Sequence, residues 1–256
     1  MTEPTLMTRI RYALLILAAL FAPAATLSAQ QSDAPPPPPR LEATAQFTFL
    51  DTKGNSESQS LGAGGTMIWR PDPWIYSTKL LFAQTESDDE LSARSVAAGF
   101  RAARALNPRL SAFGQYDFLR DVFAGVDQRH ITEGGLAYLT FDTPVHRLRV
   151  DAGIGYLTEH RPTETFDSAT FSLAAAYRLA ISSNSEFTYD PRFLQPFADA
   201  GASKFDHLAA LNVALNSILS LKLSHILRFS AEPPVGFDST DSITAVSLVA
   251  KVLRPR

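Results

Sequence analysis

The sequence contains no cysteine among its 256 residues, and its formal net charge is −3. The absence of cysteine excludes a disulfide framework, a cysteine-based zinc site and a catalytic cysteine. The slightly negative charge argues against nucleic acid as a partner, because proteins that bind nucleic acid carry a basic surface. Beyond the first 30 residues there is no apolar run of about 18 residues, so no transmembrane helix is predicted there.

The N-terminus has the pattern of a secretory signal peptide. Arg9 and Arg11 precede the apolar stretch YALLILAALFA, and the small residues that follow end in Leu27-Ser28-Ala29. This apolar stretch is shorter than the roughly 20 residues that span a bilayer as a helix. We therefore predict that residues 1–29 are removed after export and that the mature chain begins at Gln30; an uncleaved N-terminal anchor is the alternative.

A proline-rich segment follows the predicted cleavage site. Five consecutive prolines, Pro35 to Pro39, favour the extended polyproline II conformation because proline has no backbone N–H to donate. We predict that residues 30–40 form a stiff spacer in the periplasm, and that residues 41–256 form one folded domain.

From Leu41 onward, apolar and small or polar residues alternate with a period of two, which is the period of a β-strand. In the segment 147–156, for example, one face carries Leu148, Val150, Ala152, Ile154 and Tyr156, and the other carries Arg147, Arg149, Asp151, Gly153 and Gly155. An apolar face toward lipid and a small, polar face toward a lumen are typical of outer-membrane barrels. Lipid offers no hydrogen bonds to free strand edges, so the sheet must close.

The fold prediction is thus an all-β, closed antiparallel transmembrane barrel with an up-and-down meander. It has about twelve strands, expected at 42–51, 58–70, 74–85, 91–104, 109–121, 130–142, 145–159, 166–181, 185–193, 204–215, 218–230 and 240–253. The ninth strand is the weakest of these, because Pro191 and Pro196 interrupt it. Between the strands, long connections are expected to alternate with short turns, beginning with a long one.

The segments Asp51 to Gly65, Val150 to Glu159 and Asp238 to Leu253 carry a family resemblance. The element Gly54-Asn55-Ser56, the run Gly153 to Tyr156 and the closing strand resemble the bacterial family called domain of unknown function 481, whose members are described as salt-induced outer-membrane proteins. The likeness extends from Phe47 to Leu253. It implies an outer-membrane barrel with no established activity.

Aromatic residues near strand ends indicate where the membrane surfaces lie. Trp69 and Trp74 flank a turn, and tryptophan prefers the interface between lipid and water. We therefore expect both as interface aromatics. The partners expected are outer-membrane lipid and lipopolysaccharide, together with the barrel-assembly machinery during insertion; the oligomeric state is not predicted.

The remaining residues that bear on function are charged side chains that the strand alternation places toward the lumen. The predicted lumen-facing residues are Lys79, Arg94, Asp117, Arg147, Arg149, Asp151, Arg178, Lys222 and Arg228. A cationic wall would favour anions in a pore. In a barrel of twelve strands, however, arginine and aspartate can also pair across the lumen and close it, and strand number alone does not decide between these two states.

No motif for catalysis or cofactor binding was found. A hydrolase of the outer membrane is a further, less favoured alternative. It would need a histidine and a serine two residues apart on one strand face, and only His130 with Thr132 resembles such a pair. The acidic run at Glu86 and Asp88 to Glu90 lacks the spacing of a calcium loop. We predict no enzyme, no metal and no cofactor, and an envelope-structural or stress-related barrel of the outer membrane. A narrow anion-preferring channel is the first alternative, and a soluble exported β-sandwich is another.

Overall fold

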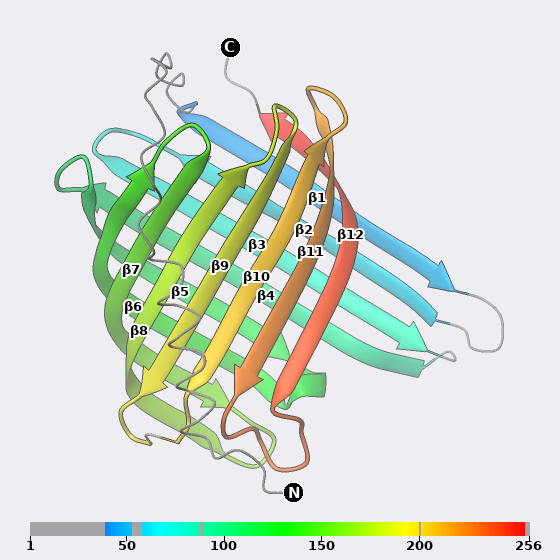
Figure 1. Cartoon of the computed structure of the whole chain (residues 1–256). Helices are drawn as coiled ribbons and strands as arrows, with labels where there is room; N and C mark the ends of the chain where they lie inside the picture. The colour runs from blue at the N-terminus through cyan, green and yellow to red at the C-terminus, as the bar shows by residue number, and fades with distance from the viewer. Residues whose placement is uncertain (1–38, 53–57, 88–89, 200, 254–256) are drawn as a thin grey trace, which may run out of the picture. The chain divides into compact units, whose positions relative to one another are not determined.

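The computed structural model describes residues 39–52, 58–87, 90–199 and 201–253. Within these residues twelve antiparallel strands follow one another as a meander, and β1 pairs with β12 to close the barrel (Figure 1). The strands are β1 (Leu41–Thr52), β2 (Ser58–Trp69), β3 (Trp74–Ser87), β4 (Glu90–Ala105), β5 (Leu110–Asp121), β6 (Val126–Asp142), β7 (His146–His160), β8 (Thr165–Ala180), β9 (Ser185–Pro196), β10 (Lys204–Ala214), β11 (Leu219–Ser230) and β12 (Thr240–Leu253). The predicted fold class is confirmed.

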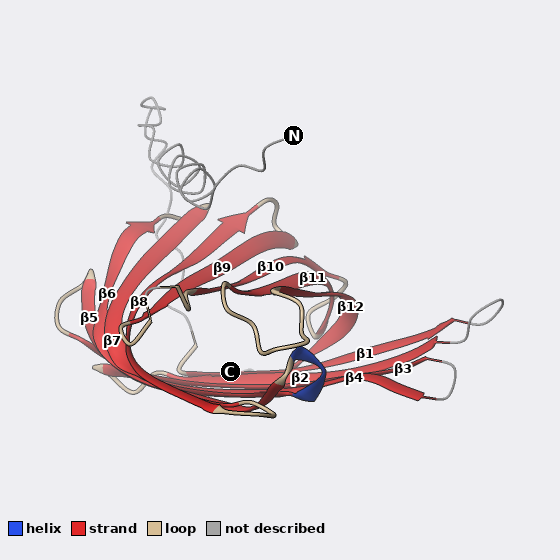
Figure 2. Cartoon of the chain, turned by 90° about the horizontal axis from the view of Figure 1, so that it is seen from below, coloured by secondary structure: helices blue, strands red, loops and turns tan. Residues whose placement is uncertain are grey.

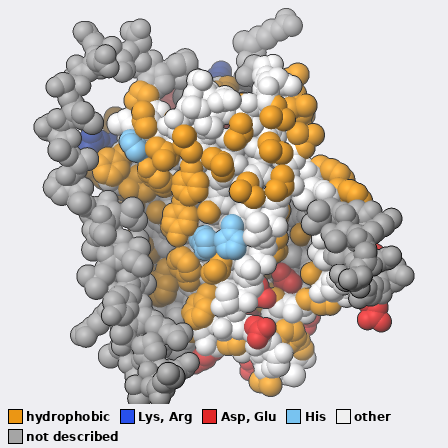
Figure 3. All heavy atoms as spheres, turned by 45° about the vertical axis from the view of Figure 1, so that its right-hand side comes forward, with side chains coloured by type: hydrophobic (Ala, Val, Ile, Leu, Met, Phe, Trp, Pro, Cys, Tyr) orange, Lys and Arg blue, Asp and Glu red, His pale blue; other side chains and the backbone are white. Residues whose placement is uncertain are grey.

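Alternation along each strand divides the side chains between the two faces of the wall. In β7, Ile154 is 69% exposed on the outside, whereas Asp151, Leu157 and Glu159 are buried inside the barrel. Successive side chains of a strand point to opposite faces, so one face of every strand meets the lumen. Figure 3 shows hydrophobic side chains spread over the outer face of the wall, as expected of a surface in contact with lipid.

The strand boundaries agree with the predicted ones to within four residues, and the largest differences are the start of β6 and the end of β9. This strand continues through Pro191 to Pro196 instead of ending at residue 193. Its pairing with β10 is continuous, but its ladder with β8 omits residues 190 and 191. Pro191, which has no backbone N–H to donate, is therefore accommodated by a gap in the ladder between β8 and β9.

The expected alternation of long and short connections holds only in part. We call one end of the barrel the loop end, with connections 53–57, 88–89, 122–125, 161–164, 197–203 and 231–239. The opposite turn end has connections 70–73, 106–109, 143–145, 181–184 and 215–218. The connection between β3 and β4 was predicted to be long, but β3 extends to Ser87 and β4 begins at Glu90, so that prediction is wrong. The connection between β5 and β6 is also shorter than predicted, because β6 begins at Val126 rather than at residue 130.

Viewed along the barrel, the wall is not uniformly curved. Strands β1 to β4 form a flat wall, and β5 to β12 form a curved one (Figure 2). A short 3-10 helix, η1 (Val122–Ala124), follows β5 at the loop end. No helix of the described residues is long and apolar enough to cross a membrane. The predicted signal peptide and most of the predicted spacer lie outside the described residues, so those assignments stay predictions.

Candidate functional site in the lumen

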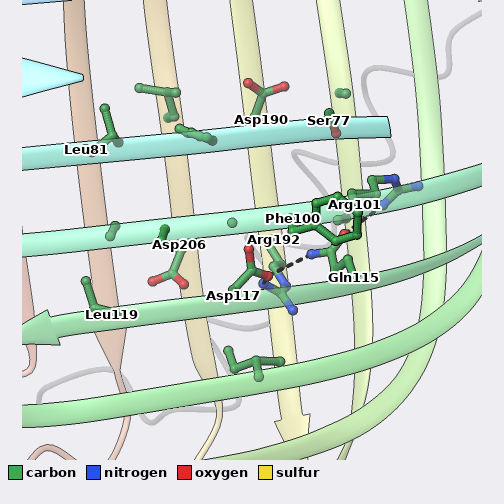
Figure 4. A pocket seen from close by; sticks show the side chains of 18 of the residues that line it. Ser77, Leu81, Phe100, Arg101, Gln115, Asp117, Leu119, Asp190, Arg192 and Asp206 are labelled. Atoms are coloured by element: carbon green, nitrogen blue, oxygen red, sulfur yellow. Dashed lines mark hydrogen bonds and ion pairs between the residues drawn. The ribbon is translucent and has the colours of Figure 1, made fainter. Parts of the chain in front are cut away.

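A cavity of about 560 Å³ occupies the middle of the lumen. Five of the predicted lumen-facing residues line it: Lys79, Asp117, Arg149, Asp151 and Arg228. Figure 4 shows charged side chains of several strands directed into this space. The size falls within the range of small-ligand pockets. The cavity therefore has room for a small solute inside the barrel.

The wall of this central cavity carries more cations than anions. Its six cationic residues are Lys79, Arg101, Arg129, Arg149, Arg192 and Arg228, and its four anionic residues are Asp117, Asp151, Asp190 and Asp206. Among these lining residues alone, cations exceed anions by two. Three of the cations, Arg129, Arg192 and Arg228, also pair with carboxylates just outside the lining, which are Glu159, Glu133 and Asp121. Lys222 adds another cation on the lumen side, where its Nζ lies 3.2 Å from Gln46 Oε1.

The strongest feature of the lumen is a pair of arginines that reach across it. Arg192 of β9 contacts Asp117 of β5 and Glu133 of β6, each at 2.7 Å (Figure 4 labels Arg192 and Asp117 beside each other). Glu133 is 4% exposed and Arg192 is 17% exposed. Because β9 and β5 are separated by three strands on the shorter path around the wall, this contact connects two separate parts of the barrel.

The second arginine makes an even longer crossing. Arg228 of β11 contacts Asp121 of β5 at 2.7 Å and Ser95 of β4 at 3.3 Å. In the closed order of strands, β11 and β5 lie opposite each other. Charge-assisted hydrogen bonds of this length are about twice as strong as neutral ones. Together the two arginines connect β9 and β11 to β4, β5 and β6 across the lumen.

At the loop end, a buried carboxylate gathers three cations. Glu159 is fully buried and contacts Arg129, Arg161 and Lys204, at 2.5, 2.8 and 3.2 Å respectively. Burial disfavours the charge of Arg161, but its hydrogen bonds to Glu159 and to Glu164 outweigh burial and raise its pKa. A buried charge must be paired, and Glu159 has three cationic partners, which come from β6, from β10 and from the connection after β7.

An apolar cluster lies beside this group of charges. Leu157 of β7, Ile131 of β6 and Leu194 of β9 pack together inside the barrel, with Phe166 against them. The charged group and the apolar cluster narrow the part of the lumen next to β6 to β9 at the loop end.

The remaining predicted lumen residues lie away from the central cavity. Arg147 and Arg178 are about half exposed near the turn end, beside Asp142 at 3.7 Å and Glu186 at 3.5 Å respectively. The prediction for Arg94 is wrong: it stands on the same face of β4 as the exposed Phe100, and its guanidinium binds Gln84 on the outer side of the wall. The strand bulge at the end of β3 lies next to this position, so local alternation assigned it to the wrong face.

Several charged lumen residues were missed from the sequence. Arg101 was missed because it stands on the opposite parity to Arg94 in the predicted strand 91–104, and Arg94 was assigned to the lumen. The alternation along the predicted strand 130–142 could have found Glu133. Arg101 lies 3.0 Å from Asp151 and 3.8 Å from the ring centre of Phe113. Arg192 was missed because the prolines around it weakened the prediction of its strand.

The two predicted interface aromatics stand together at the turn end. Trp69 and Trp74 are 49% and 38% exposed on the outer face, and both stack on Tyr76, with ring centres 5.5 and 5.9 Å apart. The guanidinium of Arg104 lies 5.8 Å from the Trp74 ring centre. Such a mixed aromatic and cationic patch suits the boundary between lipid and water.

The structure places no hydrolase pair at His130. This histidine accepts or donates a hydrogen bond with the Tyr116 hydroxyl at 2.8 Å and lies 5.3 Å from the Phe118 ring, outside the lumen. Within the described ranges, no three His, Asp or Glu side chains are gathered so that they could hold a metal ion. Asp88 and Asp89 of the acidic run lie outside the described residues.

Comparison with known proteins agrees with the sequence resemblance. The family described as Protein of unknown function, DUF481 matches residues 45–252. The chain belongs to this family. A relative, the uncharacterized protein YdiY of Escherichia coli (strain K12), is 29% identical over 204 residues, covering 78% of this chain and 79% of YdiY.

Among solved structures, the NanC porin is similar over 83% of this chain and all of that chain, with a TM-score of 0.51 and 9% identity. The COG4313 outer membrane channel from Pseudomonas putida F1 is similar over 88% of this chain and 99% of that one, with a TM-score of 0.47 and 9% identity. At this identity the NanC likeness shows the fold alone. The barrel fold is that of bacterial outer-membrane proteins, which supports an outer-membrane location.

Proposed function

We propose that this protein is a narrow, non-enzymatic channel of the outer membrane that admits small solutes and prefers anions. The observation that carries the proposal is the central cavity, which is large enough for a small molecule and is lined by an excess of two cations. A wall with fixed charge of one sign concentrates solutes of the opposite sign. The excess is small, so the expected preference for anions is modest.

The cross-lumen ion pairs make the resting channel narrow. Arg192 and Arg228 occupy the section between β9 to β11 and β4 to β6, and the buried Glu159 group narrows the loop end. Passage then requires these side chains to move or to exchange partners with water or solute. Low conductance is the expected result.

A second candidate function is an envelope-structural barrel without transport. It is favoured by the same ion pairs, since a lumen tied between separate parts of its wall resists opening. In either case, we propose that the outer apolar face and the patch at Trp69 and Trp74 contact outer-membrane lipid and lipopolysaccharide, and that the barrel-assembly machinery inserts the chain.

Planar-bilayer recordings of the purified, detergent-folded protein separate the two functions. Discrete conductance steps with a reversal potential on the anion side support the channel. Arg149→Glu should reduce or invert this selectivity, because Arg149 lines the central cavity. Arg147→Glu is the matched control: it has the same charge change in the same strand, but stands half exposed near the turn end. A folded barrel without steps, both in the wild type and in Arg192→Gln/Arg228→Gln, would overturn the channel in favour of the structural role.

A further inference from the structure

A carboxylate and an amine in the central cavity have no partner in the described part of the chain. Asp190 of β9 and Lys79 of β3 both line the cavity, and both residues are exposed to the lumen. Their side chains interact with other charges only at longer range, without a hydrogen bond or an ion pair. Figure 4 shows the Asp190 carboxylate directed into the cavity. Two free charges of opposite sign therefore lie in one cavity.

The position of Asp190 in the sheet explains why it is free. Its partner in the ladder with β10 is Leu208, and its ladder with β8 has a gap at this position. Asp206, the other cavity carboxylate on this part of the wall, instead stands opposite Arg192 and Arg228. The ladders therefore place no cation directly opposite Asp190, and the cations that face it lie on more distant strands.

Three cations from different parts of the wall face Asp190. Lys79 of β3, Arg149 of β7 and Lys222 of β11 all interact with it electrostatically, but none is at ion-pair distance. Arg149 is only partly compensated, because the carboxylate that it contacts, Asp151, also binds a second arginine. Lys222 donates to an uncharged amide. The site therefore combines one unpaired carboxylate with an excess of cations, separated by space that the cavity leaves open.

The two signs of charge decide which solute fits this space. Across a gap filled with water, opposite charges attract each other only weakly, because water screens them. A solute in the gap replaces this weak attraction by charge-assisted hydrogen bonds to both sides. A simple anion would bind the cations but meet repulsion from Asp190, and a simple cation would meet repulsion from Lys79, Arg149 and Lys222. A solute that carries both a carboxylate and an ammonium group matches all four residues.

We propose that this part of the central cavity is a binding site for a small zwitterion, such as a free α-amino acid. Lys79 and Lys222 hold the carboxylate of the solute, Asp190 holds its ammonium group, and Arg149 adds to the positive field. The assignment rests on the proposed channel function and names its solute: the excess of cations attracts the carboxylate, and Asp190 selects those carboxylates that also carry a positive charge. A solute without the ammonium group leaves the charge of Asp190 unpaired and is bound less well.

Swelling of proteoliposomes that contain the purified protein tests this zwitterion site. The solutes are alanine, a zwitterion, lactate, an anion of similar size, and glycerol, an uncharged molecule of similar size. We expect alanine to enter faster than the other two in the wild type. Asp190→Asn should slow alanine, speed lactate and leave glycerol unchanged, whereas Lys79→Gln should slow both alanine and lactate.

Glu186→Gln is the matched control for Asp190→Asn. It neutralises another carboxylate of β9, but one that is paired with Arg178 near the turn end, so it should leave the preference for alanine unchanged. Alanine that enters no faster than glycerol in the wild type, or at a rate that Asp190→Asn does not change, would overturn the zwitterion site.

Exchanging the two free charges separates a binding role from a structural one. Lys79→Glu/Asp190→Lys should recover the alanine entry that Asp190→Lys alone loses, because a zwitterion can bind in the reversed orientation; no recovery would contradict the assignment. Heat-modifiable gel mobility confirms that each variant folds. If the wild-type barrel excludes glycerol, the channel proposal fails, and alanine binding to the micelle-folded protein, measured by saturation-transfer NMR, decides the site alone. A signal that is lost in Asp190→Asn supports the site, and no signal in the wild type overturns it.

Discussion

Replacing Arg192 by glutamine tests whether the cross-lumen ion pairs hold the barrel together. The variant removes the cation that binds Asp117 and Glu133, both at 2.7 Å. Among the described residues, Glu133 has no other ion-pair partner, and its side chain is 4% exposed. Asp117 is 35% exposed and also accepts a hydrogen bond from Gln115 at 2.8 Å. The two carboxylates are therefore affected unequally.

The expected loss of stability comes mainly from Glu133. Leaving one partner of a buried pair uncompensated costs about 3–5 kcal/mol. The partly exposed Asp117 adds at most about 1 kcal/mol, because water replaces the lost partner. A loss of about 3 kcal/mol lowers the folding equilibrium constant by roughly two orders of magnitude.

Two further variants make the reasoning testable. Arg192→Gln/Glu133→Gln removes the charge left behind, so it should recover most of the loss, whereas Asp117→Asn alone should cost about 1 kcal/mol or less. Denaturant titration in detergent micelles, followed by the fluorescence of Trp69 and Trp74 and by heat-modifiable gel mobility, measures these differences. If Arg192→Gln unfolds at the wild-type denaturant concentration, or if the double variant is no more stable than Arg192→Gln, the structural role of the crossing is refuted.

Three other predictions concern packing, membrane contact and export. Gly135→Ala should prevent or strongly impair folding, because its added Cβ would overlap a backbone carbonyl of β7, whereas Gly114→Ala, with open space around it, should fold normally in the same gel assay. Ile154→Arg should lower the stability of the barrel in lipid vesicles by about 2–4 kcal/mol, since a charge would face hydrocarbon, and Ile154→Leu is the control; equal stability would contradict the lipid-facing assignment. Intact-mass measurement of the exported protein should give a chain that begins at Gln30, and a mass that includes residues 1–29 would support the uncleaved anchor.

The strand pattern and the two faces of the wall can be predicted from the sequence alone. A strand period of two is local, because successive side chains point to opposite sides whatever the strand pairs with. This explains why the predicted strand 145–159 matches His146–His160, and why Ile154 lies outside while Asp151 lies inside. It also explains why the ninth strand was predicted to end at residue 193: Pro191 and Pro196 weakened the local strand signal, but β9 continues to Pro196 and a gap in its ladder with β8 accommodates Pro191.

Only the tertiary structure decided which charges meet and how completely the barrel closes. The partners of Arg192 and Arg228 lie on strands several positions away in the closed order, and the alternation along one strand carries no information about which residues stand opposite across the lumen. The same holds for the seam: β1 and β12 each have the pattern of a fully paired strand, yet they pair over residues 43–47 of β1 and then separate. Closure depends on the register and curvature of all the strands together, which is a property of the assembled sheet rather than of any segment.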